Sequence, residues 1–339
     1  MALLVHAVAG RPVQASASPL LFLMTVARLE EAGVEGLALA TTRAMRIDAT
    51  SLEEVMEQLS APPQPMPGVQ DAVQARIARA PRPRRANPPE FLAREGRWVS
   101  LTSPLKHLIG DWRCTDGAHS LLSVNALRVD DAEVHSASTD GAGVVALARL
   151  AGCGPEGGAV LRLRGGGGAA RSVAHAWVNA GGRIHLLEGR RPLTPRPREA
   201  AHAGPDDDAV LGIDFDGNGE GLTARKRLIP SYQNKPLHAQ GTLTSAIIDG
   251  RWMLVAQHLE AWRTLWAPEL ERVLPSMPEL MDDLLALEGQ TTGYGSGGAS
   301  LGEYQGVEYF TLYVGTQGSW SASAGYSGLG ASAWTFGEK

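Results

Sequence analysis

The sequence has few cysteines and few lysines, and both scarcities limit what the protein can be. Only two cysteines, Cys114 and Cys153, occur in 339 residues, so no disulfide framework is expected. Only four of the 31 basic residues are lysine, which together with abundant alanine and glycine indicates a GC-rich genome. A single arginine is therefore weak evidence for phosphate binding. The formal net charge of −5 argues against general affinity for nucleic acid.

Long apolar runs and targeting signals are also missing. No stretch reaches the ~18 apolar residues that a membrane-spanning helix needs, so no span is expected. The first ten residues are apolar but lack the basic region that opens a signal peptide, and Arg11 follows at once. We therefore expect a cytoplasmic protein as synthesised. No Cys/His cluster has metal-ligand spacing, and we expect neither a metal nor a cofactor.

Composition divides the chain into four predicted segments. Residues 1–60 predict a small α/β unit, with strands near 3–8 and 36–40, a helix over 20–32, and a helix that begins after Ser51. Residues 61–90 contain eight of the 21 prolines and predict a linker. Residues 91–290 form a segment of helix and strand signals that ends in a helical extension. Residues 291–339 form a tail rich in glycine, serine and aromatic residues.

Cys114 is a candidate nucleophile because the sequence after it predicts a helix. Thr115 or Asp116 is placed to cap that helix, and an apolar stripe at helical spacing runs over 118–126. A thiol at a helix N-terminus lies beside unpaired N–H groups and the positive end of the dipole, and both favour the thiolate. The alternative is that Cys114 is a small apolar residue packed under a loop.

Residues 173–188 predict a β-hairpin that turns at Gly181-Gly182. In that register His175 lies opposite Glu188. Because directly opposed Cβ atoms are about 4.5–5.5 Å apart, the carboxylate can hydrogen-bond the imidazole. A histidine oriented by a carboxylate and brought to a thiol is an activated-nucleophile arrangement. The alternative is a surface hairpin whose His and Glu simply pair.

These two segments resemble motifs of the protein-glutaminases. Residues 114–119, Cys-Thr-Asp-Gly-Ala-His, resemble the Cys-x-x-Arg-Ala-His segment of that family, and the predicted hairpin resembles its second motif and that of papain-fold deamidase toxins. The resemblance implies an α+β protein with a papain-like catalytic module over residues 91–290, flanked by α/β and Gly/Tyr-rich segments. It further implies that Cys114 is the nucleophile, His175 the base and Glu188 the carboxylate that orients the base.

The activity implied by this resemblance is cysteine-dependent deamidation of protein glutamine. The Cys114 thiolate would attack a side-chain carboxamide to form a thioester, while backbone N–H groups hold the oxyanion. His175 would protonate the departing ammonia and then activate water. An amine acceptor would instead give transglutaminase-like acyl transfer. The family also implies a protein substrate, delivery out of a bacterial cell as a toxin or effector, and an immunity or carrier partner.

A non-enzymatic function is the principal alternative. Five of the six tyrosines and twelve glycines lie in the tail, which has almost no charge. Exposed aromatic residues with few charges mark interaction surfaces. On this hypothesis the protein is a component of a particle or secretion apparatus, and Cys114 is inert.

Three further patterns give no support to a function. Residues 214–219 begin like a calcium loop, but Arg225 stands where the bidentate Glu belongs. Gly165–Gly168 lacks the following Lys-Ser/Thr of a phosphate loop. Trp262 and Trp266 are four residues apart on an expected helix, which indicates core packing.

Overall fold

We describe a computed structural model of the chain, in which two compact units are distinguished. The described residues are 4–61, 67–79, 96–108, 112–117, 119–130, 133–217, 222–231, 243–289, 298–304, 307–316, 318–325 and 334–338. Unit 1 comprises residues 1–49, 53–97 and 272–339, and unit 2 comprises residues 50–52 and 98–271. Within the described ranges, no helix is long and apolar enough to cross a membrane.

Unit 1 combines two parallel strands with a group of helices. Its elements are β1 (Leu4–Gly10), α1 (Ser18–Glu31), a 3₁₀ turn (Leu39–Thr41), β2 (Thr42–Asp48), most of α2 (Leu52–Ser60), α3 (Pro67–Arg79), α7 (Met277–Gly289), and β12 to β15 (Gly298–Tyr304, Val307–Thr316, Gly318–Gly325 and Trp334–Glu338). β1 and β2 pair in parallel. α1 has Pro19 in its first turn and is closed by Gly33 at φ +82°, which follows proline and glycine preferences at helix ends.

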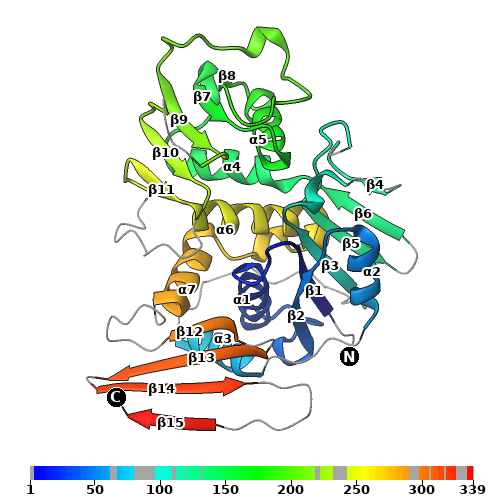
Figure 1. Cartoon of the computed structure of the whole chain (residues 1–339), viewed down its shortest axis with the longest axis vertical. Helices are drawn as coiled ribbons and strands as arrows, with labels where there is room; N and C mark the ends of the chain where they lie inside the picture. The colour runs from blue at the N-terminus through cyan, green and yellow to red at the C-terminus, as the bar shows by residue number, and fades with distance from the viewer. Residues whose placement is uncertain are drawn as a thin grey trace. The chain divides into compact units, whose positions relative to one another are not determined.

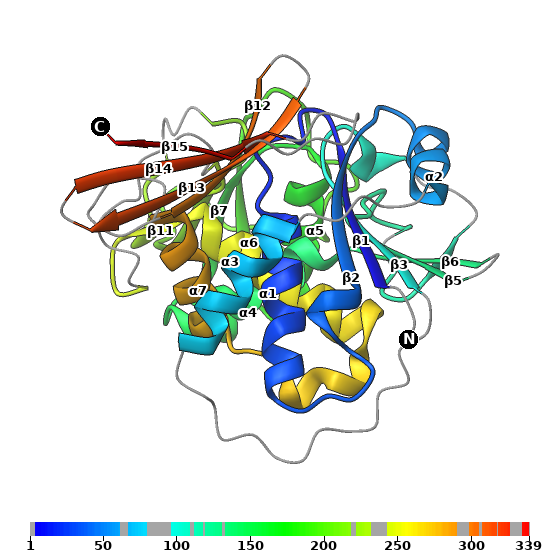
Figure 2. The same ribbon diagram turned by 90° about the horizontal axis from the view of Figure 1, so that it is seen from below.

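The helices α1, α3 and α7 pack against one another, as Figure 2 shows. Asp283 of α7 is fully buried and binds Arg28 of α1 through two hydrogen bonds of 2.8 and 2.9 Å. Arg76 of α3 donates to the same carboxylate at 3.0 Å. One carboxylate therefore ties three helices together.

Unit 2 contains a parallel sheet with crossover helices. Its elements are β4 (Arg113–Cys114), β5 (Ala126–Asp130), β6 (Glu133–Ala137), α4 (Thr139–Leu150), β7 (Val160–Arg164), α5 (Gly168–Asn179), β8 (Arg183–Leu187), β9 (Ala209–Asp214), β10 (Lys226–Ile229), β11 (Ile247–Asp249) and α6 (Gly250–Ala261), with short turns at Leu105–His107, Glu156–Gly158, Glu199–Ala201 and Trp262–Trp266. Two elements, β3 (Gly96–Leu101) and Pro268–Val273, cross the boundary between the units.

Five strands of unit 2 form one sheet in the order β11-β10-β9-β7-β8, with every neighbouring pair parallel. β7 is buried along its whole length, as expected for a central strand covered on both faces. Its two arginines are accommodated by specific acceptors; for example, Arg162 donates to the carbonyl oxygens of Thr223 and Pro205 at 2.9 and 2.8 Å. α5 connects β7 to β8 and contacts both (Figure 1).

The predicted papain-like fold is wrong, and the hairpin over 173–188 is the main reason. Residues up to Asn179 belong to α5, whose buried residues Val173, Ala174, Trp177 and Val178 lie on one helical face. Gly181, at φ +92°, ends this helix, and Gly182 N–H donates to the Trp177 carbonyl at 3.0 Å. A glycine pair at a helix C-terminus and a glycine pair in a hairpin look alike in sequence.

The helix predicted after Cys114 is also not formed. Cys114 lies in the two-residue strand β4, paired with β6, and the chain continues as turns through the described residues between it and β5. Asp249 precedes α6, and its side chain accepts the Arg251 N–H as the N-cap of that helix. The prediction that Trp262 and Trp266 are core residues is confirmed, since both are buried.

The four segments predicted from composition stay a prediction. α3 and its buried Val73 and Ile77 lie inside the stretch expected to be a linker, whereas residues 62–66 and 80–95 lie outside the described residues. The tail contains an antiparallel sheet in the order β12-β13-β14-β15.

Candidate dinucleotide and polar site of unit 2

A glycine-rich turn connects the buried strand β7 to helix α5. Gly165 adopts φ +121°, and a Cβ there would lie 2.9 Å from Phe215 Cβ. A Cβ on Gly166 would lie 2.4 Å from the Pro192 carbonyl oxygen. Packing therefore explains both of these glycines.

Gly167 has neither of these reasons to be glycine. Its φ is −77°, which any residue adopts, and among the described residues no atom lies within 4 Å of a Cβ built there. It is the N-cap of α5 and makes no side-chain cap. The turn thus leaves an open approach to unpaired backbone N–H groups at a helix N-terminus, which is where phosphate groups bind in strand–turn–helix units.

The turn also lies where the strand order of the sheet reverses. From β7 the chain passes through α5 to β8 on one side and then crosses to β9 on the other. In open parallel sheets, ligands bind outside the carboxyl ends of the strands at such a switch point.

A buried ion pair marks the carboxyl ends of β7 and β9. Arg164 Nη1 and Asp214 Oδ2 are 3.1 Å apart, and Arg164 Nε donates to the Glu188 carbonyl oxygen at 3.0 Å. Asp214 Oδ1 accepts the backbone N–H groups of Asp216 and Gly217. These contacts explain the acidic residues of 214–219, and no cluster able to hold a metal ion is found in the described part of the chain.

Lys106 and Asp140 form the centre of a second polar group. Lys106 lies in the short turn Leu105–His107, and its Nζ is 2.6 Å from Asp140 Oδ2. Asp140 lies in the first turn of α4 and is fully buried, whereas the Lys106 side chain keeps about a fifth of its surface exposed. Asn125 Nδ2 donates to the other Asp140 oxygen at 3.2 Å. A lysine whose side chain is partly exposed is thus ion-paired with a buried carboxylate.

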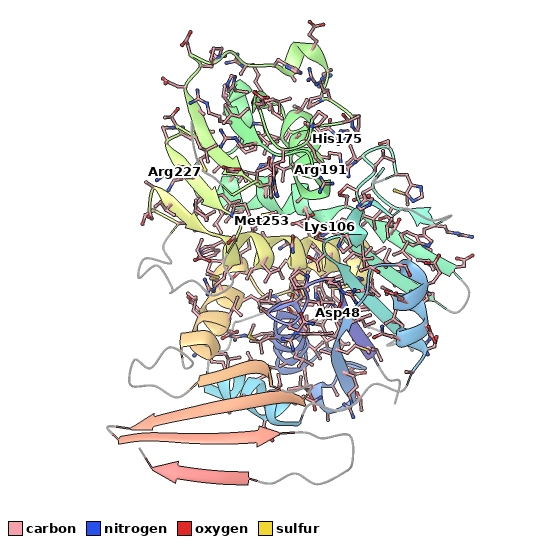
Figure 3. The ribbon with its side chains drawn as sticks, in the orientation of Figure 1. Asp48, Lys106, His175, Arg191, Arg227 and Met253 are labelled. Atoms are coloured by element: carbon pink, nitrogen blue, oxygen red, sulfur yellow. The ribbon has the colours of Figure 1, made fainter. Side chains whose placement is uncertain are left out.

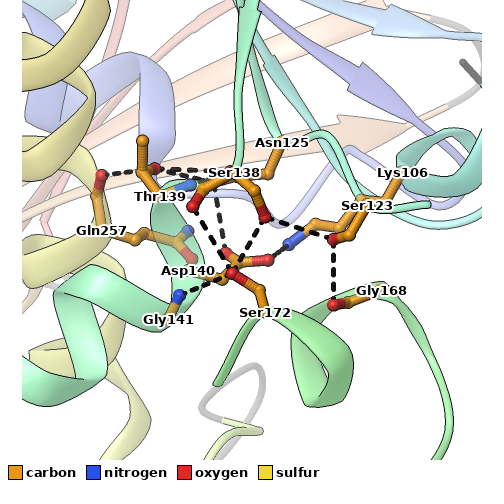
Figure 4. A network of polar contacts seen from close by, with 10 residues as sticks. All are labelled: Lys106, Ser123, Asn125, Ser138, Thr139, Asp140, Gly141, Gly168, Ser172 and Gln257. Atoms are coloured by element: carbon orange, nitrogen blue, oxygen red, sulfur yellow. Dashed lines mark hydrogen bonds and ion pairs between the residues drawn. The ribbon is translucent and has the colours of Figure 1, made fainter. Parts of the chain in front are cut away.

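Further polar side chains surround this pair (Figure 4). Asn125 Oδ1 accepts the Thr139 N–H at 2.5 Å, and the Thr139 hydroxyl donates to the Gln257 carbonyl at 3.0 Å. The Gln257 side-chain amide lies beside Asp140 in Figure 4 and has no hydrogen bond among the described contacts. The Lys106 ammonium and the Gln257 amide thus lie close to the same buried carboxylate.

The glycine-rich turn and the Lys106–Asp140 pair are neighbours. A Cβ built on Gly168 would lie 3.1 Å from Lys106 Cβ and 3.1 Å from Ser123 Oγ. Ser123 Oγ donates to the Gly168 carbonyl at 2.9 Å. The start of α5 consequently lies beside Lys106, the residue that is ion-paired with Asp140.

The three residues predicted as a catalytic triad lie on separate elements. Cys114 is half-buried on β4, where its Sγ is 3.7 Å from Asp116 Oδ1. His175 is exposed on α5, and its Nε2 bonds the Asn179 amide at 2.8 Å (Figure 3). Glu188 is exposed just after β8. Among the described contacts, none joins any two of the three. Burial raises the pKa of the other thiol, Cys153.

Comparisons with known proteins agree with this fold. No protein-family model matches the sequence, and no curated protein is significantly similar to it. Solved structures do match: shikimate 5-dehydrogenase from Thermus thermophilus, solved with NADP(H) and shikimate, has a TM-score of 0.54 at 22% identity, covering 83% of this chain and 98% of that one. Mycobacterium tuberculosis shikimate dehydrogenase gives 0.54 at 18% identity, covering 84% and 99%. The Ael1 enzyme from Pseudomonas putida gives 0.54 at 20%, covering 83% and 98%.

These neighbours overturn the family and activity inferred from sequence motifs. Their fold is that of shikimate dehydrogenases, not of papain-like protein-glutaminases. The Cys-His-Glu hydrolase, the deamidase toxin and the transglutaminase all rested on the papain-like module and lose their support with it. The non-enzymatic assembly protein rested on the aromatic tail, and the structural neighbours give it no support. At such low identity the likeness shows the fold alone.

Sequence reasoning missed the residues at the centre of both sites. Gly165–Gly168 does not match the Lys-Ser/Thr phosphate loop, but a strand followed by four glycines and a helix is the pattern of a dinucleotide turn. That signal was present in the sequence. Lys106, Asn125 and Asp140 carry no spacing signal, since only the fold brings them together.

Proposed function

We propose that this protein is a nicotinamide-dinucleotide-dependent dehydrogenase that interconverts an alcohol and a ketone on a small hydroxylated substrate. The observation that carries the proposal is the contact between the glycine-rich turn and Lys106, whose ammonium is ion-paired with the buried Asp140. A dinucleotide site and a proton-transfer group adjoin each other there. The structural neighbours named for shikimate support this reaction class and a substrate of similar size.

The residues of the turn fit a dinucleotide. The free N–H groups at the start of α5 would hold the pyrophosphate, and the open side of Gly167 gives it room for close approach. When bound, the nicotinamide ring accepts or supplies hydride. The proposal replaces the expectation, drawn from the sequence, that no cofactor is needed.

Lys106 has the position and chemistry of the proton-transfer residue. In alcohol oxidation the unprotonated amine of Lys106 takes the proton of the substrate hydroxyl as the carbon loses hydride, and the resulting ammonium pairs with Asp140. In the reverse direction the Lys106 ammonium gives that proton to the carbonyl oxygen. Asp140, held by Asn125, fixes the direction of the ammonium. The Gln257 amide is placed to bind a second substrate oxygen.

Glu188 predicts a preference for NAD over NADP. It follows β8 about 20 residues after Gly168, the place where an acidic residue hydrogen-bonds the adenosine ribose. Gly189 lies beside the turn, since a Cβ there would be 3.1 Å from Gly165 N. The nearby Arg190 is paired with Asp216. A carboxylate at this position would repel the 2′-phosphate of NADP.

A turnover assay tests the proposed function. The wild-type protein is mixed with NAD⁺ or NADP⁺ and a panel of cyclic and acyclic hydroxy acids that includes shikimate, and reduced nicotinamide is followed by absorbance. We expect turnover of at least one substrate, faster with NAD⁺ than with NADP⁺, and a shift of that preference toward NADP⁺ in Glu188→Ser. The matched control is Glu156→Ser, another exposed acid of unit 2. No turnover with any substrate and no binding of either dinucleotide would refute the proposal.

A further inference from the structure

Ser172 of α5 caps the first turn of α4, the helix that carries Asp140. The first N–H groups of a helix have no partner inside it, and the N-cap of α4, Ser138, supplies no side-chain cap. Two side chains from elsewhere satisfy them instead: Asn125 accepts the Thr139 N–H, and Ser172 Oγ of α5 accepts the Gly141 N–H at 2.9 Å. Asp140 therefore lies between two externally held N–H groups.

The Ser172 hydroxyl is fully used in this arrangement. It accepts from Gly141 N and from the Ser138 hydroxyl at 2.9 Å, and it donates to the Ser138 carbonyl at 3.4 Å. Because a hydroxyl offers one donor and two acceptor sites, the Ser172 hydroxyl can form no further hydrogen bond. The side chain is 2% exposed, which means that water cannot replace it without rearrangement.

The backbones of the two helices are also in direct contact at this point. A Cβ on Gly141 would lie 2.1 Å from the Ser172 carbonyl oxygen, so only glycine fits beside Asp140. α5 begins at Gly168, the end of the glycine-rich turn. If α5 moves when a dinucleotide binds, the contact between Ser172 and Gly141 would consequently move Asp140 as well.

From these contacts we infer that Ser172 is a positioning residue that sets the Asp140 carboxylate against Lys106 and links it to the dinucleotide turn. This inference rests on the proposed function. Figure 4 shows Ser172 directly beneath Asp140 and Ser138. The hydroxyl does not touch the reacting atoms; it acts by holding the start of α4.

The test compares Ser172→Ala with Ser136→Ala. Ser136 is a matched control because it is buried in the same unit and its hydroxyl has no hydrogen-bond partner among the described residues. We expect Ser172→Ala to lower kcat about tenfold, the loss expected from one hydrogen bond, with the dinucleotide KM changed less than about twofold. Ser136→Ala should leave both parameters near wild type. Equal effects of the two substitutions would overturn the inference.

A double-mutant cycle separates positioning from general damage. If Ser172 acts through Asp140, then Ser172→Ala should cost little further kcat in an Asp140→Asn background. Fully additive losses would contradict the inference.

A second measurement does not depend on enzymatic activity. It therefore tests the positioning role of Ser172 even if the proposed dehydrogenase function is wrong. The side-chain carboxyl resonance of Asp140 and the exchange rate of the Gly141 amide are measured by NMR in the three proteins. We expect Ser172→Ala, and not Ser136→Ala, to shift the resonance and to accelerate exchange. Unchanged values in Ser172→Ala would overturn the positioning role, even if the enzyme turned over.

Discussion

Asp140 of unit 2 and Asp283 of unit 1 are both fully buried and both ion-paired, yet their surroundings differ. Asp283 binds Arg28 through both oxygens and Arg76 through one, and these arginines come from two other helices. Asp140 binds one lysine that keeps part of its surface exposed, together with a neutral amide. The first carboxylate is saturated by cations that cannot lose a proton, whereas the second holds one that can.

This difference indicates which buried charge serves structure and which serves chemistry. Arginine forms bidentate pairs and stays charged, which suits a clamp between helices; lysine is a point charge that exchanges protons when its surroundings allow. A buried carboxylate alone is therefore no sign of an active site. Whether a buried carboxylate belongs to an active site depends on its cationic partner: on how exposed that partner is and on whether it can give up a proton.

We expect the largest effect when the lysine that pairs with Asp140 is replaced by arginine, the cation that pairs with Asp283. Lys106→Arg keeps the positive charge beside Asp140 but removes a group that can give up its proton, so we expect kcat to fall by about 10²–10⁴-fold. The free energy of unfolding should change little. Steady-state kinetics and urea denaturation measure the two quantities.

The control for Lys106→Arg is the reverse exchange, Arg28→Lys. It removes a bidentate pair in unit 1 and should lower stability while kcat is retained. A Lys106→Arg enzyme that keeps its full kcat would show that Lys106 transfers no proton.

Removal of the Asp283 carboxylate should cost stability rather than activity. Asp283→Ala leaves two arginines without their shared partner, one of them buried, and we expect a loss of about 3–5 kcal/mol in the free energy of unfolding. Urea denaturation provides the measurement. Asp48→Ala, which removes a surface partner of Arg11, should have a much smaller effect. Similar losses for the two variants would contradict the role of Asp283 as a clamp.

Acid should destabilise unit 2 through a third buried group, His258. Burial lowers its pKa from 6.5 to about 3, and its Nε2 accepts a hydrogen bond from Trp262 Nε1 at 3.1 Å. Above pH 6.5 the imidazole is neutral in both states. As the pH falls toward 3, the unfolded chain binds a proton that the native state refuses, so stability decreases by about 2 kcal/mol at pH 5.

The variant His258→Gln tests this pH dependence. Its free energy of unfolding, measured by denaturation from pH 7 to 4, should fall less steeply than that of the wild type. The exposed His175→Gln is the matched control and should keep the wild-type slope. Parallel curves for His258→Gln and wild type would show that another group causes the acid sensitivity.

Local signals in the sequence identified several elements of unit 1. Pro19 and Gly33 delimit α1, and Ser51 directly precedes α2, close to the predicted positions. The strand predicted near 36–40 instead begins at Thr42, after a 3₁₀ turn. Chain ends, caps and prolines are local, so a single sequence reveals them.

The parallel sheet of unit 2 could not be predicted from the sequence for two reasons: β7 contains arginines, and the hydrophobic periodicity of residues 173–180 fits both a strand and a helix. Arg162 and Arg164 give β7 an alternating pattern, although both are buried by acceptors that come from distant loops and strands. Residues 173–180 satisfy a strand and a helix pattern equally, and Gly181-Gly182 fits either end. The site residues were missed because Lys106 and Asp140 meet only in the folded chain.

Calorimetric titration with NADH and NADPH measures directly whether the glycine-rich turn binds a dinucleotide, because it needs no knowledge of the substrate. We expect the wild-type protein to bind at least one of them. Gly167→Val, which fills the open approach to the turn, should weaken binding by more than about tenfold. Gly204→Val is the control: Gly204 is exposed in unit 2, with ordinary backbone and no atom closer than 3.9 Å to its Cβ position, and its substitution should leave affinity unchanged. Absence of binding to both dinucleotides, or equal affinity of wild type and Gly167→Val, would show that the glycine-rich turn is not a dinucleotide site.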